Sequence, residues 1–367
     1  MRGSERRRLS ASRVPLTPTL SPQAGRGSPT EPVAPLCIDL AETCTSHAPA
    51  STAASRHQWL PPTRRKRALL AIRAIAFAAL VAFALGTPGF LSTVSLVSLM
   101  TTMSFIGCVA IGMTFITLSG NIMSFALGAT LGATTIVFTL SLPLGLAAAL
   151  VVAFAFSAAL TGLQGFVVGY FKANPIIVSM AVLALIYGLV TFFTGGRGIY
   201  PEGSEADVLK GNIGPLPKSL AAFLLTVIVS QFILSCTRFG RHIHMVGSNI
   251  RAAEAAGIET WHTATGAYVV AGLCTACSAV LMAARYASGD MEHGIGYDYQ
   301  AISAVLVGGT AIGGGEGSAL RTLAGAFIIA LVQGLLLLNG FSTQMQYLTI
   351  GVIVLIVIML QTLGERS

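Results

Sequence analysis

Charged side chains are scarce in this sequence. Only 10% of its 367 residues are Asp, Glu, Lys or Arg, whereas 54% are hydrophobic. A soluble domain carries about 25% charged residues, because its surface faces water. No Asp, Glu, Lys, Arg or His occurs between residues 74 and 171, and about 20 apolar residues suffice for one membrane crossing. The composition therefore excludes an ordinary soluble protein and predicts an all-α fold, a polytopic bundle of membrane-spanning helices.

Motifs for catalysis, metal binding and nucleotide binding are also missing. The chain has no HExxH, GxSxG or GxxxxGK[ST] motif, and its six histidines lie outside the predicted spans. Cys274 and Cys277 have CxxC spacing, but they lie in an apolar run, which favours helix packing over metal or redox chemistry. We therefore expect no catalytic residue, no metal, no cofactor and no enzyme activity on this chain.

Side chains of Asp, Glu, Lys, Arg and His are absent from the middle of the predicted spans as well. Arg285, Asp298 and Arg321 fall at span boundaries. Carriers that are coupled to protons or sodium usually keep such groups near the membrane midplane. An ion-coupled mechanism is not expected, so energy for transport, if any is used, must come from elsewhere.

Ten apolar runs are predicted to be membrane spans. The run 299–312 is short for a full crossing and is compatible with a re-entrant segment. The pairs Gly128/Gly132 and Gly165/Gly169 have GxxxG spacing, which predicts close packing of helices. The ten runs are 69–87, 92–118, 122–140, 144–170, 175–194, 218–236, 263–284, 299–312, 320–339 and 345–363.

Basic residues are concentrated near the N-terminus. Of the 22 Lys and Arg residues, 12 lie in residues 1–73, and the cluster 64–67 with Arg73 directly precedes the first span. The positive-inside rule predicts a cytoplasmic N-terminus, and an even number of spans returns the C-terminus to the same side. Aromatic residues are not interleaved with the basic ones, so no nucleic-acid binding is expected.

The N-terminal region differs in composition from the rest. Residues 1–63 contain nine of the 15 prolines and no apolar run long enough for a signal-peptide core. Such a segment cannot bury enough apolar surface to offset its ordering entropy. We expect a disordered tail at 1–63, which we also consider a candidate gene-model artefact, followed by a transmembrane domain at 64–367.

The most informative polar segment is the loop 237–262, which the span count places in the cytoplasm. Asn249 is a favourable N-cap, and Gly257 is a typical helix terminator, so the run between them predicts a helix over 250–256. Its alanines leave a smooth surface with two charged residues, Arg251 and Glu254. This pattern suits docking into a groove on another protein. The alternative, a helix lying on lipid, requires bulky apolar residues that this helix lacks.

Four segments together resemble one known family. The run RFGRHIHMVGSNIRAAEAAGI (238–258) resembles the coupling loop of ribose-type permeases, the membrane subunits of bacterial ABC importers for monosaccharides and related small polar solutes. The stretch SGNIMSFALGAT (119–130) is similar to the glycine- and serine-rich early segment of that family. Residues 162–199 resemble its loop, proline and TGG-ended span, and residues 297–318 resemble its GGT…GGxGS segment. The resemblance covers residues 69–363.

The resemblance implies a transport subunit of the bacterial inner membrane that carries a monosaccharide or similar solute. It also implies three partners: a cytoplasmic ATP-binding subunit, a periplasmic solute-binding protein, and a second permease subunit that is identical or a paralogue. The residues expected to couple to the ATPase are Arg241, Gly247, Asn249, Arg251, Ala253, Glu254, Ala255 and Gly257. The candidate pore-lining residues are Asn121, Ser124, Asn174, Gly308, Gly309 and Thr310.

Two other functions remain open on the sequence. A permease of the same architecture for a nucleoside, a branched-chain amino acid or another small solute would share these segments. A passive channel without an ATPase would account for the spans, but it would leave the helix at 250–256 without a role.

Overall fold

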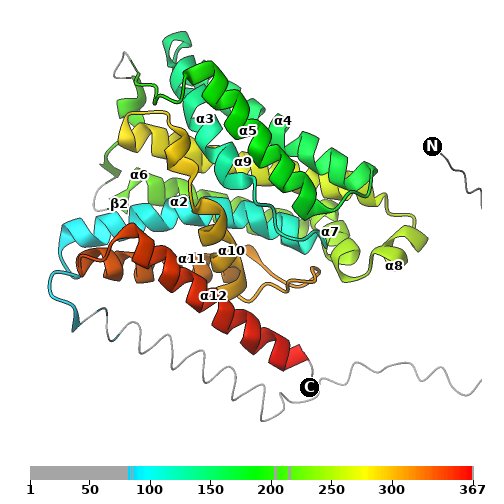
Figure 1. Cartoon of the computed structure of the whole chain (residues 1–367). Coiled ribbons are helices and arrows are strands. Elements are labelled where there is room, and N and C mark those ends of the chain that lie inside the picture. The colour runs from blue at the N-terminus through cyan, green and yellow to red at the C-terminus, as the bar shows by residue number, and fades with distance from the viewer. Residues whose placement is uncertain (1–81, 83, 85, 202–204, 214–215, 366–367) are drawn as a thin grey trace, which may run out of the picture. The chain divides into compact units, whose positions relative to one another are not determined.

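The computed structural model of the chain describes residues 82, 84, 86–201, 205–213 and 216–365 (Figure 1). All of them belong to the second of two units of the chain, Pro62–Ser367. The predicted tail, the boundary between residues 63 and 64, the basic cluster and most of the predicted span 69–87 lie outside the described residues.

The described residues are almost entirely helical. The long helices are α2 (Thr93–Leu118), α3 (Leu127–Ser141), α4 (Leu146–Tyr170), α5 (Pro175–Thr194), α6 (Lys218–Cys236), α9 (Thr260–Tyr286), α11 (Ala319–Leu338) and α12 (Thr343–Glu365). The short helices are η1 (Leu142–Leu144), η2 (Glu205–Leu209), α7 (Arg238–Ser248), α8 (Ile250–Ala255), η3 (Met291–Gly294) and α10 (Tyr297–Val307). Strands β1 (Asn212–Ile213) and β2 (Leu216–Pro217) form a small antiparallel hairpin with Asn212 opposite Pro217.

Seven of the described helical segments are long and apolar enough to cross a membrane, and each matches a predicted span. They are α2, α3 with η1, α4, α5, α6, α9 and α11. Helix α12 matches the last predicted span, and its apolar part is Thr343–Met359. The predicted class, an all-α polytopic membrane bundle, is confirmed.

Two predicted spans differ from the helices that form. In the span 122–140 the helix begins only at Leu127, because residues 121–126 are not helical. The span 299–312 is the 11-residue helix α10, which ends before Gly308. Gly309 has a φ of +84°, and the Thr310 amide donates to the Val305 carbonyl, so a glycine turn ends the helix. At 1.5 Å per residue, α10 covers about half of a bilayer core of about 30 Å.

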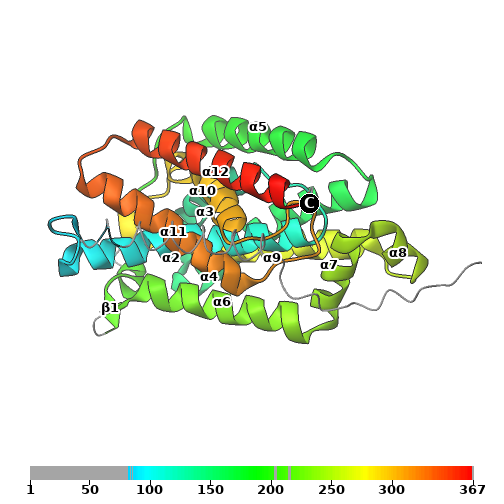
Figure 2. The same ribbon diagram turned by 90° about the horizontal axis from the view of Figure 1, so that it is seen from below.

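Helices α2 and α9 form the centre of the bundle (Figure 2). Close approach of backbones explains their packing. A Cβ on Gly112 of α2 would lie 2.8 Å from the Ala271 carbonyl oxygen of α9, and Gly165 of α4 packs against Tyr268. Gly132 of α3 packs in the same way against Met291 of η3. The predicted role of the GxxxG pairs in close helix packing is therefore confirmed.

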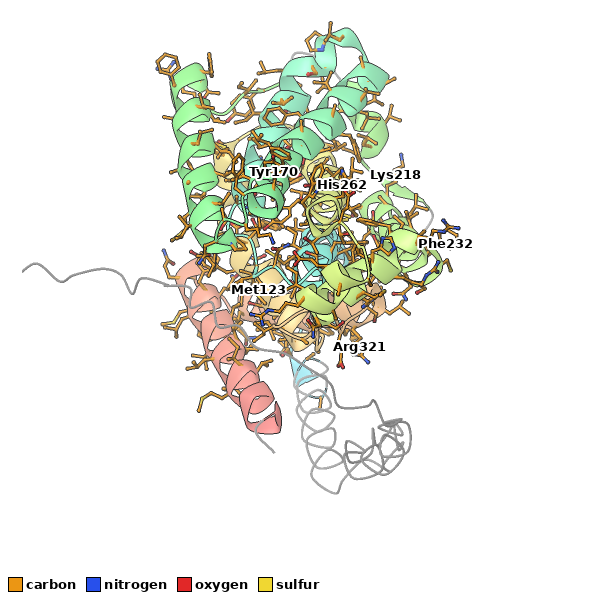
Figure 3. The ribbon with its side chains drawn as sticks, turned by 90° about the vertical axis from the view of Figure 1, so that its right-hand side faces the viewer. Met123, Tyr170, Lys218, Phe232, His262 and Arg321 are labelled. Atoms are coloured by element: carbon orange, nitrogen blue, oxygen red, sulfur yellow. The ribbon has the colours of Figure 1, made fainter. Side chains whose placement is uncertain are left out.

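Large apolar side chains cover the outer faces of the peripheral helices. Phe192 and Phe193 at the end of α5 and Phe232 on α6 are exposed, whereas Met123 lies in the interior (Figure 3). In α5 only Ser179 and Ile186 are buried. An apolar perimeter of this kind suits a protein whose surroundings are lipid or another membrane subunit.

Candidate functional site

The loop 237–262 folds into two helices, α7 and α8, which lie at one end of the bundle in both views (Figures 1 and 2). The Asn249 side chain caps α8 by accepting a hydrogen bond from the Ala252 amide at 3.1 Å. Gly257 ends it with a φ of +79°, and the Ile258 amide donates to the Ala253 carbonyl. The predicted short helix and both of its end signals are confirmed. Helix α7 was not predicted.

The residues predicted to couple to an ATPase divide into two groups. Two of them face inward: Ala253 is 2% exposed, and Gly247 packs against the ends of other segments. The side of α8 that remains available carries Ala252 and Ala256 as well as the predicted residues. The predicted residues that are exposed are Arg241, Asn249, Arg251, Glu254, Ala255 and Gly257.

Glu254 ties α8 to the end of α4. The Lys172 ammonium lies 3.1 Å from Glu254 Oε1, and Thr260 Oγ1 lies 3.4 Å from the same oxygen. The Lys172 side chain is 72% exposed, and exposed ion pairs contribute only about 0–1 kcal/mol. The pair orients the helix but does not anchor it strongly.

Gly247 anchors α7 to the rest of the bundle through backbone contacts. A Cβ at this position would overlap the Leu118 carbonyl oxygen and would lie 2.5 Å from the Gly315 nitrogen. The Gly315 amide donates to the Leu118 carbonyl at 3.1 Å, and His244 Nδ1 lies 2.7 Å from the Gly315 carbonyl oxygen. The end of α2, the end of α7 and the glycine-rich loop after α10 therefore meet directly.

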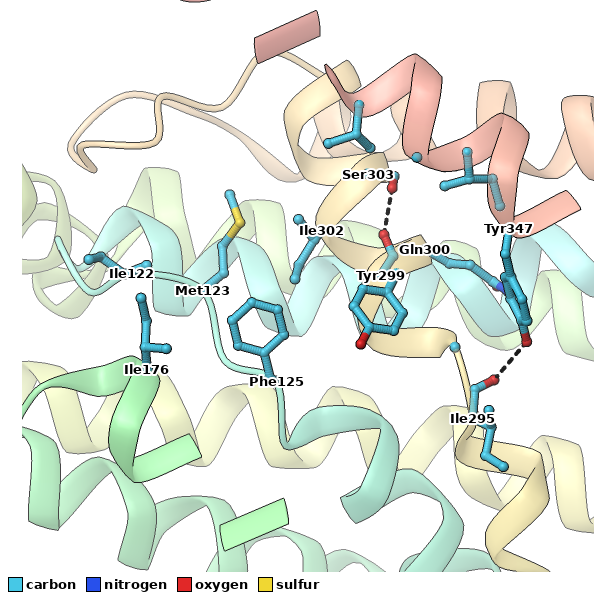
Figure 4. A pocket seen from close by; sticks show the side chains of 14 residues that line it. Ile122, Met123, Phe125, Ile176, Ile295, Tyr299, Gln300, Ile302, Ser303 and Tyr347 are labelled. Atoms are coloured by element: carbon cyan, nitrogen blue, oxygen red, sulfur yellow. Dashed lines mark hydrogen bonds between the residues drawn. The ribbon is translucent and has the colours of Figure 1, made fainter. Parts of the chain in front are cut away.

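A cavity of about 480 Å³, here called the chamber, lies between the non-helical segment 121–126, the start of α5, the first turns of α10, and α12 (Figure 4). Phe125 and Tyr299 face it with their ring centroids 6.4 Å apart. The Tyr347 hydroxyl donates to the Ile295 carbonyl across one end. The polar side chains of its lining are those of Gln300, Ser303 and the two tyrosines, Tyr299 and Tyr347, and the lining contains no charged side chain.

Gln300 and Ser303 differ in how their polar atoms are used. Ser303 donates to the Tyr299 carbonyl at 2.5 Å, within α10. The backbone amide of Gln300 donates to the Gly296 carbonyl, but its side-chain amide has no hydrogen-bond partner among the residues that the structure describes. An unpaired amide beside aromatic faces can bind a neutral polar solute by hydrogen bonds and ring contacts.

The predicted pore-lining residues do not line the chamber. Asn121 donates to Ser119 Oγ, and Ser124 is fully buried and accepts from Gln164 Nε2 at 2.9 Å. Asn174 is exposed and caps α5 by accepting from the Ile176 amide. Gly308, Gly309 and Thr310 form the turn that ends α10.

Sequence neighbours of Asn121, Ser124 and Asn174 line the chamber instead, and the predicted pore-lining residues stay a prediction. Ile122, Met123, Phe125 and Ile176 contribute to the lining. Gln300 and Tyr299 were missed, although Gly296, Tyr299, Gln300 and Ser303 share one face of a helix at spacings of three and four. That spacing was the available signal.

Asp298 occupies a more central position than the sequence indicated. It lies in the first turn of α10, is 7% exposed, and accepts a hydrogen bond from the Gly128 amide in the first turn of α3 at 2.5 Å. The N-termini of two helices thus meet at one carboxylate, which their dipoles stabilise. Among the described residues, no group of His, Cys, Asp and Glu side chains could hold a metal ion.

Comparison with known proteins identifies the family of this chain. The family described as a branched-chain amino acid transport system permease component matches residues 95–358. This chain belongs to that permease family. The permease is 27% identical over 279 residues to the ribose import permease protein RbsC of Haemophilus influenzae, covering 74% of this chain and 86% of that protein. No solved structure matches it.

Two other relatives are similar over comparable lengths. The L-arabinose transport system permease protein AraH of Escherichia coli is 30% identical over 305 residues, 82% of this chain and 91% of that protein. The galactofuranose transporter permease protein YtfT of Escherichia coli is 31% identical over 266 residues, 70% of this chain and 76% of that protein. The permease is thus a multi-pass membrane subunit of an ABC importer, a transport subunit and not an enzyme, and its family implies ATPase and binding-protein partners.

Proposed function

We propose that this chain translocates a monosaccharide or similar small neutral solute across the bacterial inner membrane. A periplasmic binding protein delivers the solute, and a cytoplasmic ATP-binding subunit supplies the energy. The observation that carries the proposal is α8, a short helix with a cap at each end and a small, exposed alanine face beside Arg251 and Glu254. Such a face fits a groove on a partner protein.

The lining of the chamber favours a neutral solute over a branched-chain amino acid as the transported molecule. A zwitterionic amino acid carries two charges, and burying an unpaired charge is costly. The lining of the chamber holds no charged side chain, and the carboxylate of Asp298 is already bonded to Gly128. A nucleoside is also neutral. The names of the relatives, which refer to ribose, L-arabinose and galactofuranose, favour a monosaccharide.

The proposal extends to topology and to a second permease subunit. We infer that both termini and α7–α8 face the cytoplasm, and that a second copy or a paralogue completes the pathway. Helix α5, which borders the chamber, has only Ser179 and Ile186 buried, so most of its apolar surface is available to such a subunit. A passive channel would need no helix shaped for docking.

Copurification and uptake test the proposal. The tagged full chain is coexpressed with the ATPase and binding protein encoded beside its gene, and the complex is reconstituted in liposomes. We expect the ATPase to be retained and uptake of radiolabelled ribose, arabinose or galactose to require internal ATP. Leucine should not compete. Failure to retain any ATPase would support the passive channel, and saturable, ATP-dependent uptake of leucine or adenosine alone would replace the solute.

A further inference from the structure

Three segments that are far apart in the sequence meet where α7 joins the bundle. They are 118–120 at the end of α2, 246–248 at the end of α7, and 313–315 in the loop between α10 and α11. We call this contact the glycine junction, because Gly120, Gly247, Gly314 and Gly315 all lie in it.

The segments of the glycine junction touch through backbone atoms. A Cβ on Gly314 would lie 2.7 Å from the Gly120 Cα, and a Cβ on Gly315 would lie 2.8 Å from the Ser248 nitrogen. Gly247 faces the Leu118 carbonyl in the same way. Contacts between backbones cannot be relieved by rotating a side chain, so a displacement of one segment must displace the others.

Two hydrogen bonds hold the Gly315 residue between its neighbours. Its amide donates to the Leu118 carbonyl of α2 at 3.1 Å. Its carbonyl oxygen lies 2.7 Å from His244 Nδ1 of α7. A carbonyl oxygen only accepts, so His244 Nδ1 is the donor. One residue of the glycine-rich loop is therefore bonded to both α2 and α7.

Two of these segments, the end of α2 and the glycine-rich loop, adjoin elements that form walls of the chamber. The end of α2 leads directly into 121–126, which contributes Ile122 and Phe125. The glycine-rich loop follows α10, which contributes Tyr299 and Gln300. A movement of α7 thus reaches both walls through a single contact. A side-chain link between Lys172 and Glu254 joins α8 to the connection between α4 and α5, and α5 contributes Ile176 to the lining. This ion pair is exposed, so it holds the two segments together only weakly.

We propose that the glycine junction transmits ATPase-driven movement from loop 237–262 to the two chamber walls, and that His244 is the positioning residue that keeps the glycine-rich loop bonded to α7. The proposal rests on the function proposed above. It assigns His244 a role in transmission, separate from docking, because its ring contacts this chain's own Gly315.

A labelling experiment on the full complex in nanodiscs tests this role without knowledge of the solute. A cysteine placed at Ile122 or at Ile295 reports on one chamber wall through its rate of reaction with a water-soluble maleimide, measured before and after ATP with orthovanadate. A complex without the added cysteine gives the background. His244→Ala removes the bond, and His244→Asn keeps a side-chain donor. The control is His242→Ala, because His242 is exposed on the same helix.

We expect ATP with vanadate to change both labelling rates in the parent, His242→Ala and His244→Asn complexes. In His244→Ala the change should shrink about fivefold, the factor that corresponds to one net hydrogen bond, while the ATPase stays bound and active. An unchanged response in His244→Ala overturns the proposal. Loss of ATPase from His244→Ala alone also overturns it, since His244 would then serve docking. Failure of the parent to retain an ATPase refutes the proposed function instead.

A second pair of variants keeps the test independent of the histidine. Gly315→Ala adds a Cβ against Ser248 at a φ of +77°, whereas Gly313→Ala adds one in open space with an ordinary φ. We expect Gly315→Ala to suppress the vanadate response at both walls and Gly313→Ala to preserve it. Equal responses in the two variants would show that the junction does not transmit movement.

Discussion

The glycine junction and the chamber are built from different contacts. At the glycine junction, backbone meets backbone, and several positions leave no room for a Cβ. In the chamber, side chains from four segments surround about 480 Å³ of space. We expect the glycine junction to be the more rigid of the two, because a contact between backbones cannot be relieved by rotating a side chain. Rigidity suits a part that transmits movement. The open space of the chamber leaves its side chains room to adapt, which suits the proposed passage of a solute.

Adding atoms at the glycine junction should have the largest effect, and it tests directly whether this contact is more rigid than the chamber. Gly247→Val places a branched side chain against the Leu118 carbonyl and the Gly315 nitrogen, and overpacking costs about 1–3 kcal/mol or more. We expect loss of both uptake and the retained ATPase, measured by size-exclusion chromatography of the complex. Gly188→Val is the control, because a Cβ on Gly188 of α5 meets nothing within 4 Å.

Near-normal assembly of Gly247→Val would show that the glycine junction can accommodate a larger side chain. The junction would then not be more rigid than the chamber. Equal damage from Gly188→Val would mean that glycine is needed for helix packing in general, without a special role at the junction.

A change in the chamber should have an intermediate effect of another kind. Gln300→Leu keeps the size of the side chain but removes its unpaired amide, so one hydrogen bond to the solute is lost. We expect the uptake rate to fall about fivefold while the ATPase stays bound. The measurement is initial uptake into liposomes beside copurification. Tyr299→Phe keeps the ring and should transport near the parent rate. An unaffected Gln300→Leu would place the solute contacts elsewhere.

Loss of the α8 cap should have the smallest effect. It distinguishes the stability of α8 from the transmission of movement through the glycine junction. Asn249→Ala removes the acceptor for the Ala252 amide and costs about 1 kcal/mol. We expect faster hydrogen exchange over 249–258 and a moderate fall in uptake, both restored by Asn249→Asp. Protection that is unchanged in Asn249→Ala would show that contacts other than the cap hold α8.

The features that could be predicted depend on local chemistry. Asn249 and Gly257 define α8 because a cap and a positive φ act within one turn of helix. The spans follow from apolar runs. Helix α7 was missed because its segment was taken as a loop, although its polar and apolar residues lie on opposite faces of a helix. The Thr237 side chain caps it by accepting a hydrogen bond from the Gly240 amide.

The candidate site could be predicted only in part. The segments around Asn121 and Asn174 border the chamber through neighbouring side chains, whereas Gly308 lies at the other end of α10 from the lining. Which face of a segment turns inward depends on how it packs against distant helices. Asp298 illustrates this: its position at a span boundary did not reveal that its carboxylate is bonded to Gly128, 170 positions away in the chain.

The scarcity of charge alone was enough to identify a membrane bundle, because 98 consecutive residues without Asp, Glu, Lys, Arg or His are not compatible with a water-facing surface. The sequence also determined the short helix of the loop, since caps are local. Only the tertiary structure decided that the loop, the end of α2 and the glycine-rich loop meet at one junction, and that a chamber without charged side chains lies beyond it. Backbone contacts between remote segments leave no periodic pattern in the sequence, because they arise when packed helices bring distant glycines together.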